Sequence, residues 1–293
     1  GDGTDRALSI AADTTESPIY SACYGTSGAY ALSATAAFVA GQKILIIQMQ
    51  GTNAGQYEFN TVLSYTAGTI TLQNALKTNY SITGVNRAQV RVMKQYSGVT
   101  IDANKTYTAK AWNGTTGGIL AFYCSGTTAV TGTISAKGKG FRAGASSISD
   151  AATVGENPTG TQPSQRASVN GGGGAAKYIN TPNMGGGGAG YGTDGTNGGG
   201  GSAPADDGYG YKGTAFGFSD LSGMFLGTGG GGYIYGGMIP VDGTPGGGIV
   251  IIVSSTLTVT GAVNVSATNV DFTSGQTGGG NGSGGSVYLR TLI

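Results

Sequence analysis

The sequence predicts an all-β fold with little α-helix: a β-sandwich or barrel-like N-terminal part that carries an inserted glycine-rich bundle. Three observations lead to this prediction. Short runs of β-branched and aromatic residues alternate with turn residues over residues 1–140, and no long stretch shows a helical period. A tract dense in glycine occupies residues 171–248. Similar strand pairs stand before and after that tract, which indicates an insertion into one sheet scaffold.

Residues 1–140 are predicted to form a β-rich domain. The dipeptide Ala67-Gly68 joins two apolar runs and is typical of a hairpin turn. The clearest strand candidates are Lys43–Gln50, Tyr57–Ser64, Thr69–Gln73, Gln89–Met93 and Gly118–Cys124. Residues 141–170 are small, polar and nearly free of large apolar side chains, so we expect an exposed loop there.

The glycine-rich tract holds 31 of the 59 glycines of the chain. Flexible linkers are also rich in glycine, but they lack the aromatic and aliphatic connectors that separate these glycine runs. An ordered alternative is a bundle of polyglycine-II-type helices, which have three residues per turn and no internal hydrogen bonds. Neighbouring helices then have to supply the partners that buried backbone groups require. We therefore expect a folded bundle over residues 171–248.

An internal repeat brackets this tract. Residues 117–138 (GGILAFYCSGTTAVTGTISAKG) match residues 247–267 (GGIVIIVSSTLTVTGAVNVSA), and GGSVYLRTLI at 284–293 restarts the pattern. The repeat predicts two matching strand pairs, with residues 249–293 completing the scaffold that holds the bundle.

Composition argues against several classes of function. The chain contains no histidine, so a His-based catalytic centre is not expected. The numbers of basic and acidic residues are nearly equal, 15 and 14, so the basic surface of a nucleic-acid binder is not expected either. The apolar runs are too short to insert into a membrane. The chain begins at Gly1 without a leader pattern, which we interpret as a secreted protein whose signal peptide has been removed. We expect that it is not an enzyme.

The two cysteines, Cys23 and Cys124, leave two possibilities open. They are either buried thiols that act as small apolar side chains, or partners in a disulfide that closes a loop of about 100 residues. Sequence spacing does not decide between these alternatives.

No catalytic or cofactor-binding set emerges from the sequence. A Ca²⁺ site among the sparse acids of the tract is conceivable, although solvated turn residues explain them better. Five tyrosines beside glycine runs offer an apolar face and a polar tip, so they either stack on sugar rings or seal the edges of the bundle. These residues are Tyr191, Tyr209, Tyr211, Tyr233 and Tyr235.

Several motifs in order resemble a glycine-rich module of large secreted bacterial surface proteins. They include AGQKILIIQMQG (40–51), AWNGTTGGILAF (111–122), GTISAKGKGFRAG (132–144) and GGGNGSGGSVYL (278–289). The resemblance implies an exported, surface-associated and non-enzymatic protein. The tract alone resembles the polyglycine-II sandwich at the tip of some bacteriophage long tail fibres, which is a receptor-binding adhesin.

The leading hypothesis is an extracellular structural protein that assembles with copies of itself into a surface fibre, filament or coat. A segment such as Ala7–Ala12 is expected to pair with the sheet edge of a neighbouring copy. The alternative is an adhesin that binds a cell-surface glycan or receptor through the connectors between glycine runs. Ice binding is a more distant alternative.

Overall fold

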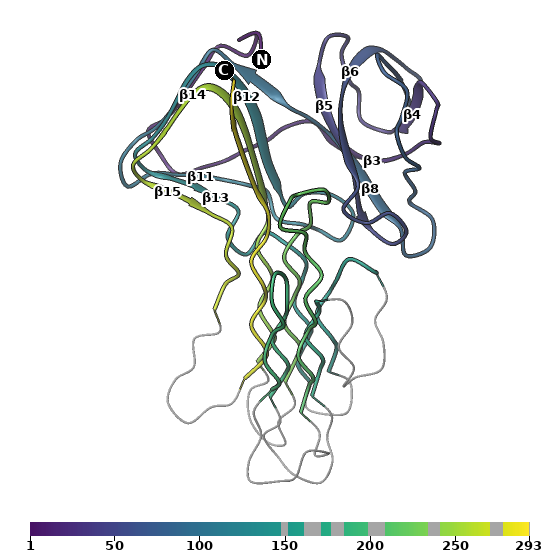
Figure 1. The fold of residues 1–293 in the computed structure, drawn as a ribbon, viewed down its shortest axis with the longest axis vertical. Helices are drawn as coiled ribbons and strands as arrows, with labels where there is room; N and C mark the ends of the chain where they lie inside the picture. The colour runs from purple at the N-terminus through teal and green to yellow at the C-terminus, as the bar shows by residue number, and fades with distance from the viewer. Residues whose placement is uncertain are drawn as a thin grey trace. The chain divides into compact units, whose positions relative to one another are not determined.

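The computed structural model contains two compact units, which we describe separately. The first comprises Gly1–Ala136, Ile249–Asn264 and Val287–Ile293, and the second comprises Lys137–Gly248 and Val265–Ser286. The residues that the structure describes are 1–147, 152–160, 171–176, 185–198, 209–233, 241–269 and 278–292. Within these ranges every regular element is a β-strand (Figure 1), which confirms the all-β prediction. None of them contains a helix of the length and hydropathy needed to cross a bilayer.

Two parallel sheets form one part of the first unit. Their strands are β1 (Ala7–Ile10), β2 (Thr14–Thr15), β9 (Lys94–Tyr96), β10 (Gly98–Ile101), β11 (Thr106–Thr108), β12 (Ile119–Val130), β13 (Thr133–Ser135), β14 (Ile249–Val259), β15 (Ala262–Asn264) and β16 (Val287–Thr291). The larger sheet has the order β1-β10-β12-β14-β16, with β9 also on β12, and the smaller has β2-β11-β13-β15. Apart from β9 and β10, which both belong to the larger sheet, successive strands alternate between the two sheets. The chain therefore winds as a parallel β-solenoid.

The sequence repeat corresponds to neighbouring turns of this solenoid. Ile119 of β12 pairs with Ile249 of β14, and Val250 of β14 pairs with Val287 of β16. Both pairings follow the alignment of the Gly-Gly motifs. The glycine-rich tract is therefore inserted between two turns of one scaffold.

A closed antiparallel barrel occupies the chain between β2 and β9. Its strands are β3 (Tyr20–Tyr24), β4 (Ala31–Ala34), β5 (Lys43–Gln50), β6 (Tyr57–Thr66), β7 (Thr69–Leu72) and β8 (Arg87–Val92), in the order β3-β4-β7-β6-β5-β8. Alternating apolar residues such as Leu32, Ile44 and Val62 fill its interior without exposure. The barrel confirms the barrel-like prediction for residues 1–140, and the solenoid turns in the same range were not predicted. Parallel pairing of distant segments leaves no local pattern in the sequence.

A buried ion pair connects the barrel to the solenoid within the first unit. The guanidinium of Arg91 on β8 donates to both carboxylate oxygens of Glu16, at 2.8 and 3.1 Å. It also donates to the carbonyls of Ile119 and Ala121 on β12. Buried charges are tolerated when they are paired and fully hydrogen-bonded, as here.

The second unit contains glycine-rich segments that run side by side (Figure 1). Backbone hydrogen bonds join these segments. Three consecutive N–H groups, those of Gly230, Gly231 and Gly232, donate to three different segments. Their acceptors are the carbonyls of Thr244, Gly187 and Thr153, each at 3.0 Å. The segment around Gly231 is therefore surrounded by backbone on several sides.

Bonds between two given segments recur at every third residue. The N–H groups of Phe141, Gly144 and Ser147 donate in turn to the carbonyls of Gly227, Gly230 and Tyr233, at 2.9, 2.8 and 3.0 Å. An ordinary β ladder repeats every two residues, so these segments follow a different period.

The predicted exposed loop at 141–170 is wrong for much of its described part. Phe141 is fully buried, and Ala152 and Val154 are 3% exposed. Glu156 is also buried and accepts two hydrogen bonds from the Arg142 side chain. Small polar residues are buried here because the bundle is built on backbone contacts, which hydrophobic patterning does not report.

Candidate functional site

Two of the predicted tyrosines, Tyr191 and Tyr233, are committed to contacts inside the second unit. The ring of Tyr191 lies edge-on to Phe216, with centroids 5.0 Å apart, and its hydroxyl shares a hydrogen bond with Ser286. Burial raises the pKa of Tyr191. Phe225 extends this aromatic cluster by an edge-on contact with Phe216 at 5.3 Å. Tyr191 is partly buried and Tyr233 is 3% exposed, so both side chains are largely engaged inside the second unit.

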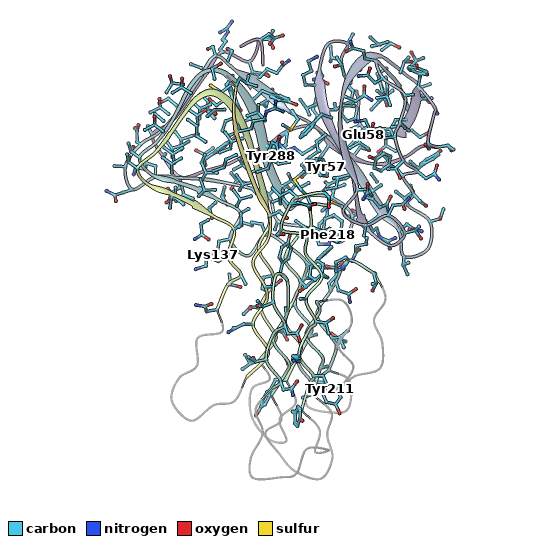
Figure 2. All side chains as sticks on the ribbon, viewed as in Figure 1. Tyr57, Glu58, Lys137, Tyr211, Phe218 and Tyr288 are labelled. Atoms are coloured by element: carbon cyan, nitrogen blue, oxygen red, sulfur yellow. The ribbon has the colours of Figure 1, made fainter. Side chains whose placement is uncertain are left out.

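Tyr209 and Tyr211 form an edge-on pair with centroids 5.7 Å apart, and Tyr211 is 37% exposed. Beside them, Lys212 pairs with Asp194 at 2.9 Å. The N–H of Ala215 and then Lys212 lower the pKa of Asp194. Figure 2 shows Tyr211 toward one end of the glycine-rich segments and Phe218 toward the other. Tyr235 lies outside the described residues.

The remaining sequence-based candidates are a disulfide and a calcium site. Cys23 and Cys124 are both free and buried, so the disulfide alternative is not realised. Burial raises the pKa of the Cys23 thiol, which is typical of an inert core cysteine. Within the described ranges, no three acidic or cysteine side chains gather as a metal site would require.

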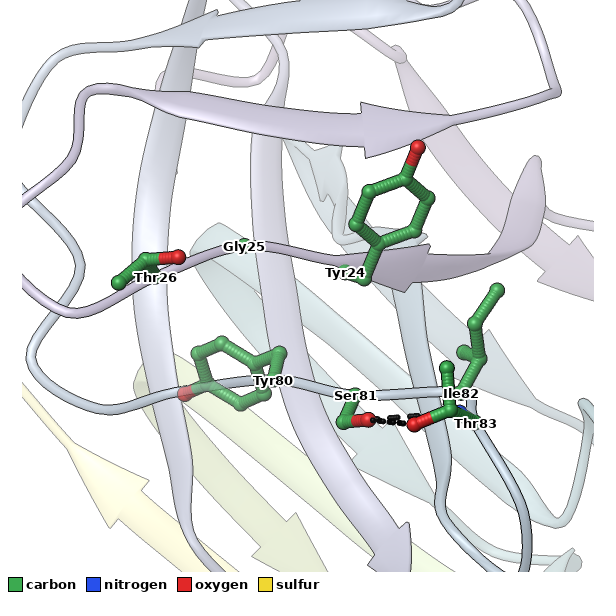
Figure 3. Close-up of a pocket in the computed structure, with 7 residues that line it drawn as sticks. All are labelled: Tyr24, Gly25, Thr26, Tyr80, Ser81, Ile82 and Thr83. Carbon is green, nitrogen blue, oxygen red and sulfur yellow. Dashed lines mark hydrogen bonds between the residues drawn. The ribbon is translucent and has the colours of Figure 1, made fainter.

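The hollow that sequence reasoning missed lies on the barrel. It has a volume of about 300 Å³ and is lined by Tyr24, Gly25, Thr26, Tyr80, Ser81, Ile82 and Thr83. We call it the Tyr24 hollow. Its two walls run side by side (Figure 3), because Gly25 and Tyr80 exchange backbone hydrogen bonds of 3.1 and 2.9 Å.

The lining of the Tyr24 hollow combines aromatic, aliphatic and hydroxyl groups and contains no charged side chain. Tyr24 is 54% exposed and Ile82 is 37% exposed, so both offer apolar surface to a ligand. The hydroxyls of Ser81 and Thr83 lie 3.0 Å apart (Figure 3), and Thr26 adds a third hydroxyl residue. Burial, and then the nearby charge of Glu58, raise the pKa of Tyr80, so its phenol stays protonated above the pH at which an ordinary tyrosine ionises.

A weak sequence signal for this hollow exists. The segments YGTS (24–27) and YSIT (80–83) each place two hydroxyl residues within three positions after a tyrosine. Each segment alone predicts nothing. The hollow forms only because the barrel brings the two segments side by side.

No family model and no curated protein matches the chain. Among solved structures, three phage tailspikes show similarity: Gp54 of Acinetobacter baumannii bacteriophage AP22 in complex with A. baumannii capsular saccharide, gp61 of Pseudomonas phage phi297 and gp49 of Pseudomonas phage LKA1. Identities are 8%, 16% and 12%, and TM-scores are 0.23, 0.24 and 0.22. The matches cover 44%, 46% and 46% of this chain, but only 28%, 24% and 30% of the tailspikes.

These matches contradict the expectation that the chain is not an enzyme, because the class they belong to is the phage tailspikes. We withdraw that expectation. At TM-scores below 0.25, the similarity assigns no activity to this chain, so the function is argued from its own residues.

Proposed function

We propose that the chain is an extracellular adhesin module that binds a neutral sugar at the Tyr24 hollow. One observation carries the proposal: an exposed tyrosine stands beside a group of hydroxyls in a hollow without charged lining. The adhesin proposal replaces the leading hypothesis from the sequence, in which the chain is a self-assembling fibre subunit.

The chemistry of the lining matches that of a sugar ring. A tyrosine ring offers an apolar face to the C–H face of a sugar, and its hydroxyl remains available to water or ligand. Serine and threonine hydroxyls both donate and accept hydrogen bonds, as sugar hydroxyls require. The volume of about 300 Å³ lies at the lower end of ligand sites, roughly 300–1,000 Å³, which favours one ring over an extended chain.

The uncharged lining favours a neutral ligand. A carboxylate or sulfate that enters such a site loses hydration without gaining a cationic partner, which is costly. We therefore expect hexoses and their uncharged derivatives to bind more tightly than uronates or sulfated sugars.

For the second unit we propose the polyglycine-II conformation, with the bundle acting as a stiff support for the module. The three-residue recurrence of the backbone hydrogen bonds supports this proposal, since a polyglycine-II helix has three residues per turn. Backbone angles near φ −75° and ψ +145° over residues 229–232 in an experimental structure would meet this expectation, and β-strand angles would not.

The proposed function is tested by glycan-array screening followed by titration calorimetry. The purified chain is expected to bind neutral sugars and to ignore acidic ones. Tyr24→Ala should weaken binding about tenfold, since it removes the stacking face. Tyr30→Ala is the matched control, because Tyr30 is an equally exposed barrel tyrosine that does not line the hollow. Equal affinity of wild type and Tyr24→Ala, or no binding by the wild type, would refute the proposal.

A further inference from the structure

Two buried polar side chains lie behind the Tyr24 hollow and bond to residues of its wall. We infer that Glu58 on β6 and Gln48 on β5 are positioning residues, which fix Tyr80 and Ser81 in the binding-competent geometry before the sugar arrives. This inference rests on the proposed function and names the groups that determine affinity at the same site.

Glu58 is 4% exposed. Its Oε1 accepts a hydrogen bond from the Tyr80 hydroxyl and another from the N–H of Lys77, each at 3.0 Å. Both donors belong to the chain between β7 and β8, so one carboxylate ties that segment to the barrel wall at two points. A buried carboxylate is tolerated only with such partners.

Gln48 is fully buried and fixes Ser81 through a reciprocal pair of bonds. Its Oε1 accepts from the N–H of Ser81 at 2.9 Å, and its Nε2 donates to the carbonyl of Ser81 at 3.0 Å. The same Nε2 donates to the carbonyl of Gln50 at 2.8 Å, which anchors the amide. Both backbone groups of Ser81 are thereby committed to one side chain.

These bonds matter because the wall they hold has little regular structure of its own. Between Leu72 and Arg87, the Gly25–Tyr80 bridge is the β pairing that the structure records. Ordering an irregular segment costs conformational entropy, and a site that is already ordered binds its ligand more tightly. Glu58 and Gln48 pre-order this segment in the free protein.

A purely structural role is the competing explanation, and the chain offers a matched control for it. Gln89 on β8 makes the same reciprocal pair with Gly117: its Nε2 donates to the carbonyl and its Oε1 accepts from the N–H, both at 2.9 Å. Gln89 is 1% exposed and does not line the Tyr24 hollow. Removing either glutamine costs the fold a similar set of bonds, but only Gln48 holds the sugar site.

The test compares Gln48→Leu, Gln89→Leu and Glu58→Gln for affinity toward the neutral sugar identified on the array. Thermal stability is recorded for each variant. We expect Gln48→Leu to weaken binding at least tenfold and Gln89→Leu to change it less than twofold. Glu58→Gln keeps an acceptor for Tyr80 and should stay within threefold of wild type, whereas Glu58→Leu should lose at least tenfold. If the leucine variants fail to fold, Tyr80→Phe, which removes only the hydroxyl that bonds to Glu58, replaces them in the affinity comparison.

Amide hydrogen exchange at Ser81 provides a readout that needs no sugar. In the free protein its exchange should quicken at least tenfold in Gln48→Leu and remain unchanged in Gln89→Leu. Unchanged exchange, or equal losses of affinity in the two glutamine variants, would overturn the inference. Failure of the wild type to bind sugar, with the expected change in exchange, would refute the proposed function and leave the positioning of Ser81 supported.

Discussion

Tyr80 connects the interior of the barrel to its surface. The residue is one of those that line the Tyr24 hollow, while its hydroxyl donates to the buried carboxylate of Glu58 at 3.0 Å. Tyr80 is 3% exposed, and both burial and the charge of Glu58 raise the pKa of its phenol. The residue that shapes the site is therefore also one that links the stability of the fold to pH.

The sign of that linkage gives a first prediction at the residue scale. In the unfolded chain a tyrosine loses its proton near pH 10, whereas folded Tyr80 retains it at higher pH. The unfolded state then binds fewer protons, so the free energy of unfolding falls as pH rises above about 10, by up to about 1.4 kcal/mol per pH unit from this group. Tyr80→Phe should flatten the decline in urea unfolding measured between pH 9 and 11. An unchanged slope in the variant would contradict the assignment.

At the scale of elements, the glycine-rich segments replace a side-chain core with backbone contacts. A Cβ added at Gly230 would lie within 3.0 Å of the carbonyl group of Gly280, a distance that real Cβ atoms essentially never show. The clashing atoms belong to the backbone of Gly280 and not to a flexible side chain, so they cannot shift without moving the chain. Glycine is required here for close approach of neighbouring segments, as at the axis of collagen.

The second prediction concerns that close approach. Gly230→Ala should lower the free energy of unfolding of the second unit by at least about 3 kcal/mol, the upper range for overpacking, because the neighbouring backbone has to shift. Gly192→Ala is the matched control, since a Cβ there meets nothing within 4 Å. Thermal and urea unfolding of both variants provide the comparison. Equal stability of the two variants would show that the segments are not packed as described.

The elements of this fold differ in how far the sequence predicts them. Lys43–Gln50 was predicted as a strand and forms β5 with the same bounds, because a long β-branched run determines it locally. The repeated Gly-Gly strands pair in the register of their alignment. The winding into a parallel solenoid was not predicted, since its partners are far apart along the chain and leave no periodic signal. The prediction of an exposed loop was wrong for Phe141 and for most of residues 152–157, because their burial depends on packing against backbone, which the hydrophobic pattern does not report.

The candidate site shows the same division. The tyrosines beside glycine runs were identified from the sequence, but Tyr191 and Tyr233 are occupied by contacts within the second unit. Tyr24 and Tyr80 carry no distinctive motif, and only barrel closure brings their segments together. A binding hollow that depends on tertiary pairing thus leaves only a weak signal in the sequence.

At the scale of the whole molecule, the β-solenoid is a scaffold with two large insertions, the barrel between β2 and β9 and the glycine-rich tract between β13 and β14. Assembly of copies into a fibre remains a prediction. The segment expected to make the contact, Ala7–Ala12, contains β1 (Ala7–Ile10), which pairs with β10 of the same chain and is an edge strand of the larger sheet. The Tyr24 hollow on the barrel is the feature on which the proposed sugar-binding function rests.

The measurement that tests the account most directly is a crystal structure of the chain with a neutral sugar bound. The account predicts that a sugar ring lies against the face of Tyr24, with its hydroxyls within about 3 Å of the Ser81 or Thr83 hydroxyl. A sugar bound elsewhere on the chain, with the Tyr24 hollow empty, would contradict it.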